Sequence, residues 1–168
     1  MSILKIYRYP EPVLRKTAIP VTNFDQSLAK LAEDMAETMY DAPGIGLAAP
    51  QVGQSIRLIV VDVSTEEDKQ SFLILVNPLI TDHEGQQLDQ EGCLSVLDLT
   101  ANVQRYKKIT VSYQDLQGKQ HELTTEDRFA VVLQHEIDHL NGILFIDHLS
   151  SLKRNLYKKK IKKRLKLG

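Results

Sequence analysis

The stretch "LQHEIDHLNG", residues 133–142, places two histidines four residues apart, with a glutamate directly after the first. On an α-helix this spacing puts the imidazoles of His135 and His139 on one face, one turn apart, where two ligands can reach one metal ion. A chance match, or a buried helix whose histidines only form hydrogen bonds, would explain the same letters. Two ligands also do not hold a catalytic metal, so a third has to come from elsewhere in the chain.

The residues that flank this motif predict a central and mostly buried helix. Thr124 or Thr125 is expected to cap its start, with Glu126 and Asp127 in the first turn, and the Asn-Gly pair at 141–142 ends it. Between these ends, apolar residues cover most of the circumference. Because such a helix excludes water, it suits a metal site better than it suits a solvated face.

The rest of the chain predicts an α+β fold in one domain, with antiparallel strands packed around this helix. We expect another helix within 27–44, buried strands within 55–63 and 71–80, and a hairpin over 107–123 that turns near Gly118. The 168 residues are 42% hydrophobic and 26% charged, which is typical of a globular protein. With no apolar run of membrane-spanning length, no export signal and a single cysteine, the expected compartment is the cytoplasm.

The C-terminal segment holds an excess of positive charge. Residues 1–148 carry 12 basic and 22 acidic residues, a net charge of −10, whereas the segment 149–168 holds the other nine basic residues and no acid. We expect 1–148 to be the catalytic part and 149–168 to be a basic helix of the same domain, with His148 as its cap. The expected apolar stripe of this helix is Leu149, Leu152, Leu156 and Leu167. A solvated surface helix and a helix that binds RNA both fit this pattern.

The third metal ligand is sought upstream of the motif. The metzincin peptidases place a histidine where this chain has Phe145, and no acidic residue follows Asp147, so a downstream ligand is disfavoured. Cys93 is the best candidate, because a thiolate with two imidazoles leaves an open fourth position on Zn²⁺ or Fe²⁺. A lone cysteine is also commonly an inert, buried hydrophobe. His83 and His121 compete for this role, but each lies in a polar, turn-like stretch.

A third feature is the glycine-containing segment "APGIGLAAPQVG", residues 42–53. A dinucleotide-binding loop follows a strand and opens a helix, whereas this segment is expected to follow a helix and precede a strand. The alternative is a loop whose glycines let the backbone approach a ligand closely. Gln51 would then point a polar side chain into the site.

Three segments together resemble the peptide deformylases in their order and separation: "GIGLAAPQVG" (44–53), "EGCLS" (91–95) and "QHEIDHLNG" (134–142). The segment "YPEPVLRKTAIPV" (9–21) is similar to the start of that family. The resemblance implies an enzyme that removes the N-formyl group from the initiator methionine of nascent polypeptides and releases formate.

The resemblance also implies a role for individual residues. The implied metal ligands are Cys93, His135 and His139. Glu136 would be the general acid/base, while Gln51 and the backbone N–H of Leu94 would bind the formyl oxygen. The implied substrate-binding residues are Ile45, Gly46, Glu91 and Gly92. The implied cofactor is Fe²⁺, with Zn²⁺, Ni²⁺ or Co²⁺ as substitutes.

The resemblance further implies that the substrates are N-formylmethionyl peptides and that the basic helix contacts the ribosome. We expect the protein to be a monomer that does not bind a membrane. Two positions depart from the family pattern: Leu97 stands where a proline is common, and Thr100 where many members have an arginine at the rim of the methionine pocket. These departures concern side-chain selectivity and leave the metal ligands unchanged. A metallopeptidase and a non-catalytic RNA-binding module are the rival functions.

Overall fold

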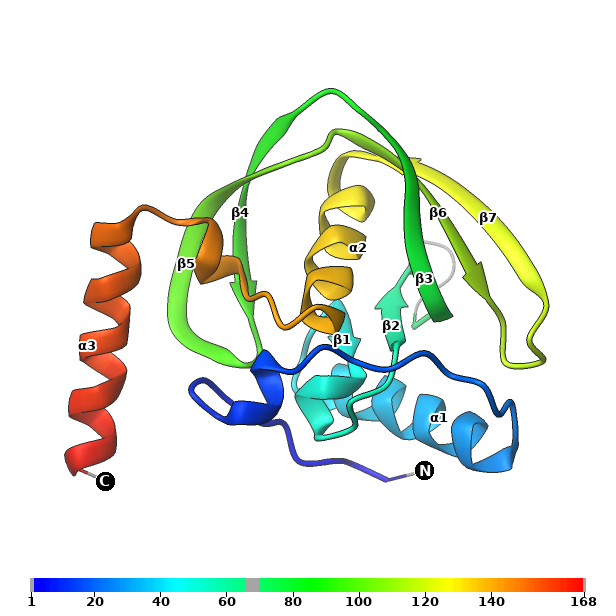
Figure 1. The fold of residues 1–168 in the computed structure, drawn as a ribbon, viewed down its shortest axis with the longest axis horizontal. Helices are drawn as coiled ribbons and strands as arrows, with labels where there is room; N and C mark the ends of the chain where they lie inside the picture. Colours follow the sequence, from blue (N-terminus) through cyan, green and yellow to red (C-terminus); the bar gives the residue numbers. More distant parts are fainter. Residues whose placement is uncertain (1, 66–69, 168) are drawn as a thin grey trace.

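Two antiparallel β-sheets and three α-helices form the part of the chain, residues 2–65 and 70–167, that this computed structural model describes (Figure 1). The helices are α1 (Gln26–Asp41), α2 (Asp127–Leu140) and α3 (Ser151–Leu167), and the short 3-10 turns are η1 (Pro12–Arg15), η2 (Ala49–Val52) and η3 (Phe145–His148). The strands are β1 (Gly46–Ala48), β2 (Leu58–Asp62), β3 (Phe72–Glu84), β4 (Gln87–Cys93), β5 (Val96–Arg105), β6 (Lys108–Gln114) and β7 (Gln120–Glu126). The α+β prediction is confirmed.

The larger sheet has the strand order β1-β2-β3-β6-β7, and every neighbouring pair in it is antiparallel. Its β2 strand is apolar on both faces, because Ile59 and Val61 pack toward α2 while Leu58 and Val60 pack toward α1. The predicted hairpin is the β6–β7 pair, which turns at Gly118 with a positive φ of 82°.

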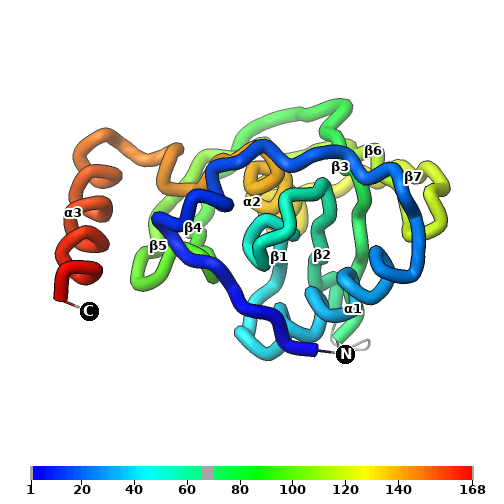
Figure 2. Tube along the Cα trace, turned by 60° about the horizontal axis from the view of Figure 1, so that its bottom comes forward, coloured from blue at the N-terminus to red at the C-terminus, as the bar shows by residue number. Residues whose placement is uncertain are grey.

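Helix α2 lies between the larger sheet and the β4–β5 hairpin (Figure 2). The predicted buried position of this helix is confirmed, since even Gln134, His135, Glu136 and His139 are buried. Its predicted cap is wrong. Thr124 and Thr125 belong to β7, which ends at Glu126. Helix α2 begins directly after it, at Asp127, which has a positive φ of 59°. The predicted end is correct, because Gly142 adopts a left-handed φ of 72° just after the last turn.

Strands β4 and β5 form a hairpin that the sequence pattern did not predict. The residues of β4, "QLDQEGC", include glycine and acids, which are depleted in strands. Cys93 ends β4 at the tight turn of this hairpin, where Cys93 pairs with Val96. The segment 42–53, predicted as a loop, also contains an element of the larger sheet: Gly46–Ala48 forms β1 and pairs with β2.

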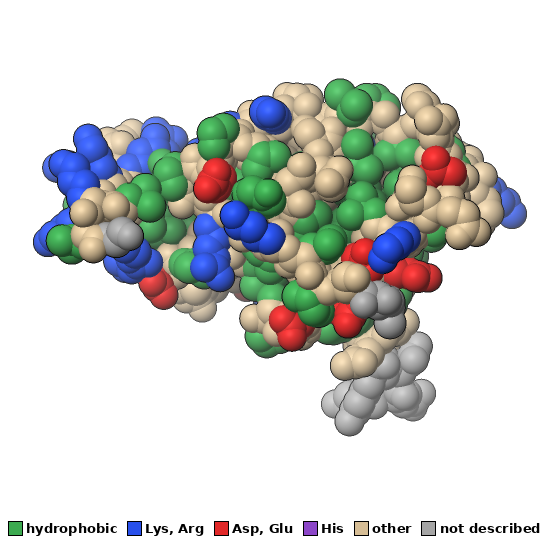
Figure 3. Space-filling model, turned by 90° about the horizontal axis from the view of Figure 1, so that it is seen from below, with side chains coloured by type: hydrophobic (Ala, Val, Ile, Leu, Met, Phe, Trp, Pro, Cys, Tyr) green, Lys and Arg blue, Asp and Glu red, His purple; other side chains and the backbone are tan. Residues whose placement is uncertain are grey.

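Helix α3 stands at one side of the molecule, beyond β5 (Figures 1 and 2). The helix was predicted, but three of the four leucines assigned to its buried face are exposed; the fourth, Leu149, is buried and lies just before the helix. Leu152 and Leu156 are 70% and 58% exposed, whereas Tyr157 and Ile161 are only 4% and 7% exposed and join the cluster that holds Phe145. Lysine and arginine side chains gather over this end of the molecule (Figure 3). Among the described helices, none has both the length and the apolar content needed to cross a membrane.

Candidate active site

Three side chains from two separate segments converge beside α2. The ligand atoms of Cys93, His135 and His139 all lie within 4.8 Å of one another, and Nε2 of His139 is 3.4 Å from the Cys93 sulfur. The two histidines share one face of α2 because they are one turn apart, and the turn of the β4–β5 hairpin presents the cysteine to that face. A thiolate with two imidazoles is a donor set that fits Zn²⁺ or Fe²⁺ and leaves a coordination position open.

The ring of His135 is held in one orientation by Glu91. Nδ1 of His135 lies 2.9 Å from a Glu91 oxygen, so this nitrogen donates its hydrogen to the carboxylate and Nε2 is the ring atom that could bind a metal after losing its proton. Burial alone would raise the pKa of Glu91, but hydrogen bonds from Arg105 and His135 lower it to about 2. The carboxylate is therefore ionised at neutral pH and accepts the histidine hydrogen.

The state of His139 also suits a metal ligand. Burial lowers the pKa of His139 well below its ordinary value, so the imidazole is neutral, as a ligand has to be. The competing histidines lie elsewhere: His83 is exposed and stacks on Tyr106, and His121 pairs with Asp115 at 2.7 Å. Phe145, at the metzincin histidine position, is 1% exposed and its ring packs against His135.

Glu136 is buried next to this cluster. In the described part of the chain, its Oε1 atom is one of the few buried side-chain oxygens without a hydrogen-bond partner, and burial raises the pKa of this carboxyl to about 7. A carboxyl that titrates near neutral pH can both take and return a proton. Gly46 leaves the space that Glu136 occupies, because a Cβ at position 46 would lie 2.5 Å from Glu136 Oε2. This close approach explains the glycine.

Gln51 points its amide toward the cluster from η2. Its Oε1 accepts a hydrogen bond from the Ala48 backbone at 3.0 Å, while Nε2 donates to Ser95 at 3.0 Å and lies 3.7 Å from the Cys93 sulfur. The first two bonds fix the amide, and the third is long and weak. One N–H of Gln51 is therefore directed to the thiol side of the cluster.

Two adjoining cavities bring the predicted residues together. One cavity of about 250 Å³ is lined by Pro43, Gly44, Ile45, Gly46, Gln51, Gly92, Cys93, Leu94, His135 and Glu136. A smaller cavity of about 100 Å³ is lined by Ile45, Gln90, Glu91, Gly92, Arg128, Val131, Val132, His135 and Glu136. The three segments that carry the predicted site residues thus meet at one place, and His139 lies behind them with 1% of its surface exposed.

Two residues that organise the site, Ser95 and Arg105, were not predicted from the sequence. Ser95 is buried, receives the Gln51 amide and donates its hydroxyl hydrogen to the Tyr7 carbonyl oxygen at 2.7 Å. Its place directly after the Cys-Leu pair was a usable signal. Arg105 contacts Glu91 through two hydrogen bonds of 2.7 and 2.8 Å. No local pattern indicated it, because it reaches Glu91 through the pairing of β4 with β5.

Comparison with known proteins identifies relatives along nearly the whole chain. A family described as "Polypeptide deformylase" matches residues 3–155. A peptide deformylase of Desulfotalea psychrophila is 65% identical over 164 residues, covering 97% of each chain, and one of Nitrosococcus oceani is 50% identical over 168 residues, covering 100% of this chain and 99% of its own.

Solved structures show the same likeness. A crystal structure of a peptide deformylase from Legionella pneumophila superposes with a TM-score of 0.90 at 48% identity, covering 99% of this chain and 97% of that one. A peptide deformylase from Ehrlichia chaffeensis in complex with actinonin gives a TM-score of 0.89 at 39% identity, with 98% of both chains covered. The chain belongs to the peptide deformylase family, metal-dependent hydrolases that remove the N-formyl group from nascent peptides.

Proposed function

We propose that this chain deformylates N-formylmethionyl peptides at a metal held by Cys93, His135 and His139, with Glu136 as the general acid/base. The observation that carries the proposal is the meeting of three ligand atoms within 4.8 Å beside a cavity that Glu136 also lines. We propose Fe²⁺ as the metal in the cell, with Zn²⁺, Ni²⁺ or Co²⁺ as substitutes, because one sulfur and two nitrogen donors suit these ions.

A metal at this place would lower the pKa of water toward neutrality and so supply a nucleophile at physiological pH. Glu136 would take the proton of that water, because its buried carboxyl lines the same cavity. The same carboxyl then returns the proton to the amine that leaves. Its burial keeps the proton on this route, since little solvent reaches the group.

The negative charge that develops on the formyl oxygen needs hydrogen-bond donors. We propose that the N–H of Gln51 now directed at Cys93, together with the backbone N–H of Leu94, supplies them. Gln51 is well suited because its other amide contacts, to Ala48 and Ser95, already fix its position. Losing one donor of this kind typically costs about 3 kcal/mol of transition-state stabilisation.

We propose that the substrate peptide lies between β1 and the end of β4, which border the cavity. Ile45 and Gly46 would contact its backbone from one side, and Gly92 from the other. The methionine side chain would enter the smaller cavity, where Val131 and Val132 provide apolar walls. The carboxylate of Glu91 is engaged with His135 and Arg105, so its part in substrate binding would be to form a wall of that pocket.

Measured release of formate tests this proposal. Purified protein loaded anaerobically with Fe²⁺ should release formate from a formyl-Met-Ala-Ser peptide, and the chelated protein should not. Cleavage of internal bonds of an unformylated peptide would instead favour the metallopeptidase, and the absence of both activities with intact RNA binding would favour the binding module.

We also propose that α3 belongs to the same domain as residues 1–148 and contacts ribosomal RNA. Support for a shared domain comes from Tyr157, which donates a hydrogen bond to the Leu97 carbonyl oxygen at 3.0 Å, and from the pair of Arg164 with Asp98 at 2.9 Å. Support for RNA binding comes from the exposed basic residues of α3, which is free of acids.

Charge reversal on the outer face of α3 separates the two readings of this helix. The proposed variant changes Lys158, Lys159, Lys162 and Lys163 to Glu. All four are exposed, so the buried contacts of Tyr157 and Ile161 remain. Ribosome binding should weaken and lose its salt dependence, while turnover of a short peptide should not change. Unaltered ribosome affinity would leave α3 as a solvated helix.

We further propose that the protein acts in the cytoplasm as a monomer. The monomeric state is supported by the active site, because the three proposed ligands and Glu136 all come from one chain. Sedimentation of the metal-loaded protein at micromolar concentration tests the oligomeric state.

A further inference from the structure

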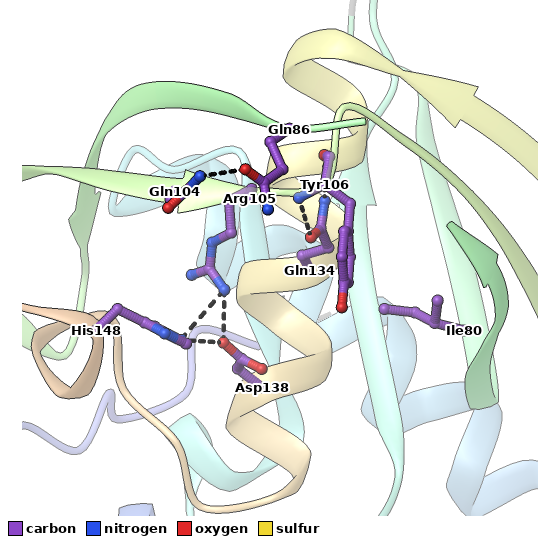
Figure 4. A pocket seen from close by; sticks show the side chains of 8 residues that line it. All are labelled: Ile80, Gln86, Gln104, Arg105, Tyr106, Gln134, Asp138 and His148. Carbon is purple, nitrogen blue, oxygen red and sulfur yellow. Dashed lines mark hydrogen bonds and ion pairs between the residues drawn. The ribbon is translucent and has the colours of Figure 1, made fainter. Parts of the chain in front are cut away.

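We propose that Asp138 and His148 are positioning residues for the metal site, acting through Arg105 and Glu91 on His135. This inference rests on the proposed function, since it assigns a task to residues that do not touch the metal or the substrate. It concerns a separate cavity beside α2, which Arg105, Asp138 and His148 line (Figure 4).

The contacts form a closed ring that begins and ends on α2. His135 meets Glu91 on β4 at 2.9 Å, and Glu91 accepts two hydrogen bonds from Arg105 on β5, at 2.7 and 2.8 Å. The remaining guanidinium nitrogen, Nη1, donates to Asp138 at 2.6 Å. Asp138 stands three residues after His135, so it lies about one turn along the same helix. The hairpin that carries Cys93 is thereby tied twice to the helix that carries both histidines.

Asp138 is the member that keeps the guanidinium in place. Arg105, Asp138 and His148 line a cavity of about 430 Å³ on this side of the helix, together with Ile80, Gln86, Gln104, Tyr106 and Gln134 (Figure 4). Without Asp138, Nη1 would keep only its longer contact of 3.4 Å with His148 Nε2, and the arginine would be less restrained from turning into this space. Glu91 would then lose one of its two restraints, and the His135 ring would be less firmly oriented.

His148 contacts both Asp138 and Arg105, with 3.4 Å between its Nε2 and Nη1 of Arg105 (Figure 4). Its Nε2 lies 2.9 Å from the same Asp138 oxygen that accepts from Arg105. This contact corrects the sequence-based expectation that His148 caps α3, since the Ser150 hydroxyl accepts from the Lys153 N–H at 3.3 Å instead. His148 belongs to η3, which also contributes Phe145 against the His135 ring. One short turn thus supports the ligand both directly and through the ring of contacts.

The chain supplies a matched control in the β6–β7 hairpin. Asp115 and His121 form a similar pair, with 2.7 Å between the atoms and exposed fractions of 29% and 37%, against 21% and 37% for Asp138 and His148. The control pair has no contact with Arg105 or Glu91 among the interactions of the described residues. His121→Phe reports the stability effect of breaking an aspartate–histidine pair away from the metal site, and Asp115→Ala adds the loss of the hydrogen bonds that Asp115 accepts from the backbone N–H groups of Gln117 and Lys119.

The experiment compares Asp138→Ala, Asp138→Asn and His148→Phe with Asp115→Ala and His121→Phe. Each protein is loaded with Co²⁺, and the visible absorption bands, the Co²⁺ dissociation constant from chelator competition, the Tm and formate release are measured. We expect Asp138→Ala to shift the bands and weaken Co²⁺ binding about 10-fold to 100-fold. Asp138→Asn keeps an acceptor for Arg105, so its bands and Co²⁺ affinity should lie closer to those of the wild type. His148→Phe should also shift the bands and weaken Co²⁺ binding.

The control variants should lower the Tm and leave the cobalt bands and affinity as in wild type. If Asp138→Ala and His148→Phe behave like the controls, the positioning role is wrong while metal binding by the wild type stands. If Asp138→Ala does not fold, the absorption bands and Co²⁺ affinity of Asp138→Asn and His148→Phe provide the test. The inference would be wrong if both variants had the bands and the affinity of the wild type. Failure of the wild-type protein to bind Co²⁺ would overturn the proposed function and this inference together.

Discussion

Helices α2 and α3 differ in which kinds of side chain they bury and expose. Helix α2 buries polar side chains, including His135, Glu136 and His139, beside Glu91 and Cys93 of β4 and beside the strand β1. Helix α3 exposes apolar ones, Leu152 and Leu156, and contacts the body through Tyr157 and Ile161. In both helices the surroundings, and not the polarity of the residues, determine which side chains are buried.

The two helices show where an apolar pattern predicts which side chains are buried. A helix in the centre of a domain has neighbours on most sides, so its position can be predicted from apolar content alone. A terminal helix with one narrow contact leaves several apolar side chains in solvent, which is ordinary for protein surfaces. The leucine spacing of α3 therefore predicted the helix and not its buried face.

The largest effect is expected at the ligand that lies outside α2. Cys93→Ala should abolish bound metal and formate release together, because two imidazoles do not hold a catalytic metal. Metal analysis and the formate assay measure this. His83→Ala and His121→Ala are the controls and should retain both, since neither histidine lies at the site. Full metal occupancy in Cys93→Ala would remove the cysteine from the ligand set.

The buried acid of α2 should also appear in the stability of the metal-free protein. With a folded-state pKa of about 7 against an ordinary 4.5, Glu136 takes up a proton on folding between these values, so its contribution to stability decreases as pH rises through this window. Glu136→Gln does not titrate, so above pH 7 the metal-free variant should be more stable than wild type by roughly 3 kcal/mol. Urea denaturation between pH 4 and 8 measures this difference. A constant difference across that range would mean that Glu136 is not buried as an acid.

The corrected face of α3 gives a smaller effect. Ile161→Ala should lower the free energy of unfolding by about 2 kcal/mol, because the side chain is 7% exposed and packs in the cluster with Phe145. Leu156→Ala should change it by less than about 0.5 kcal/mol, since that side chain is 58% exposed. Denaturation curves of the two variants compare the faces directly, and the reverse order would restore the leucine stripe as the buried one.

Much of the site was predictable because its residues lie in three short segments with their own local signals. The spacing of His135 and His139 follows from helix geometry, and the "EGCLS" segment indicated the cysteine. The strand pairing that presents Cys93 was not predictable from local pattern, since β4 is rich in residues that strands disfavour. Arg105 was missed for the same reason: its contact with Glu91 exists only because β4 pairs with β5.

In the proposed mechanism, α2 carries an acid/base, Glu136, beside ligands that hold the metal without its help. Formate release and metal content, measured on the same preparation of Glu136→Gln, test this division of roles. The variant keeps the size of the side chain but cannot take a proton, so turnover should fall about 10² to 10⁴-fold while metal content stays near wild type. Near-normal turnover would remove Glu136 from the mechanism, and loss of the metal would make it a ligand or a structural residue.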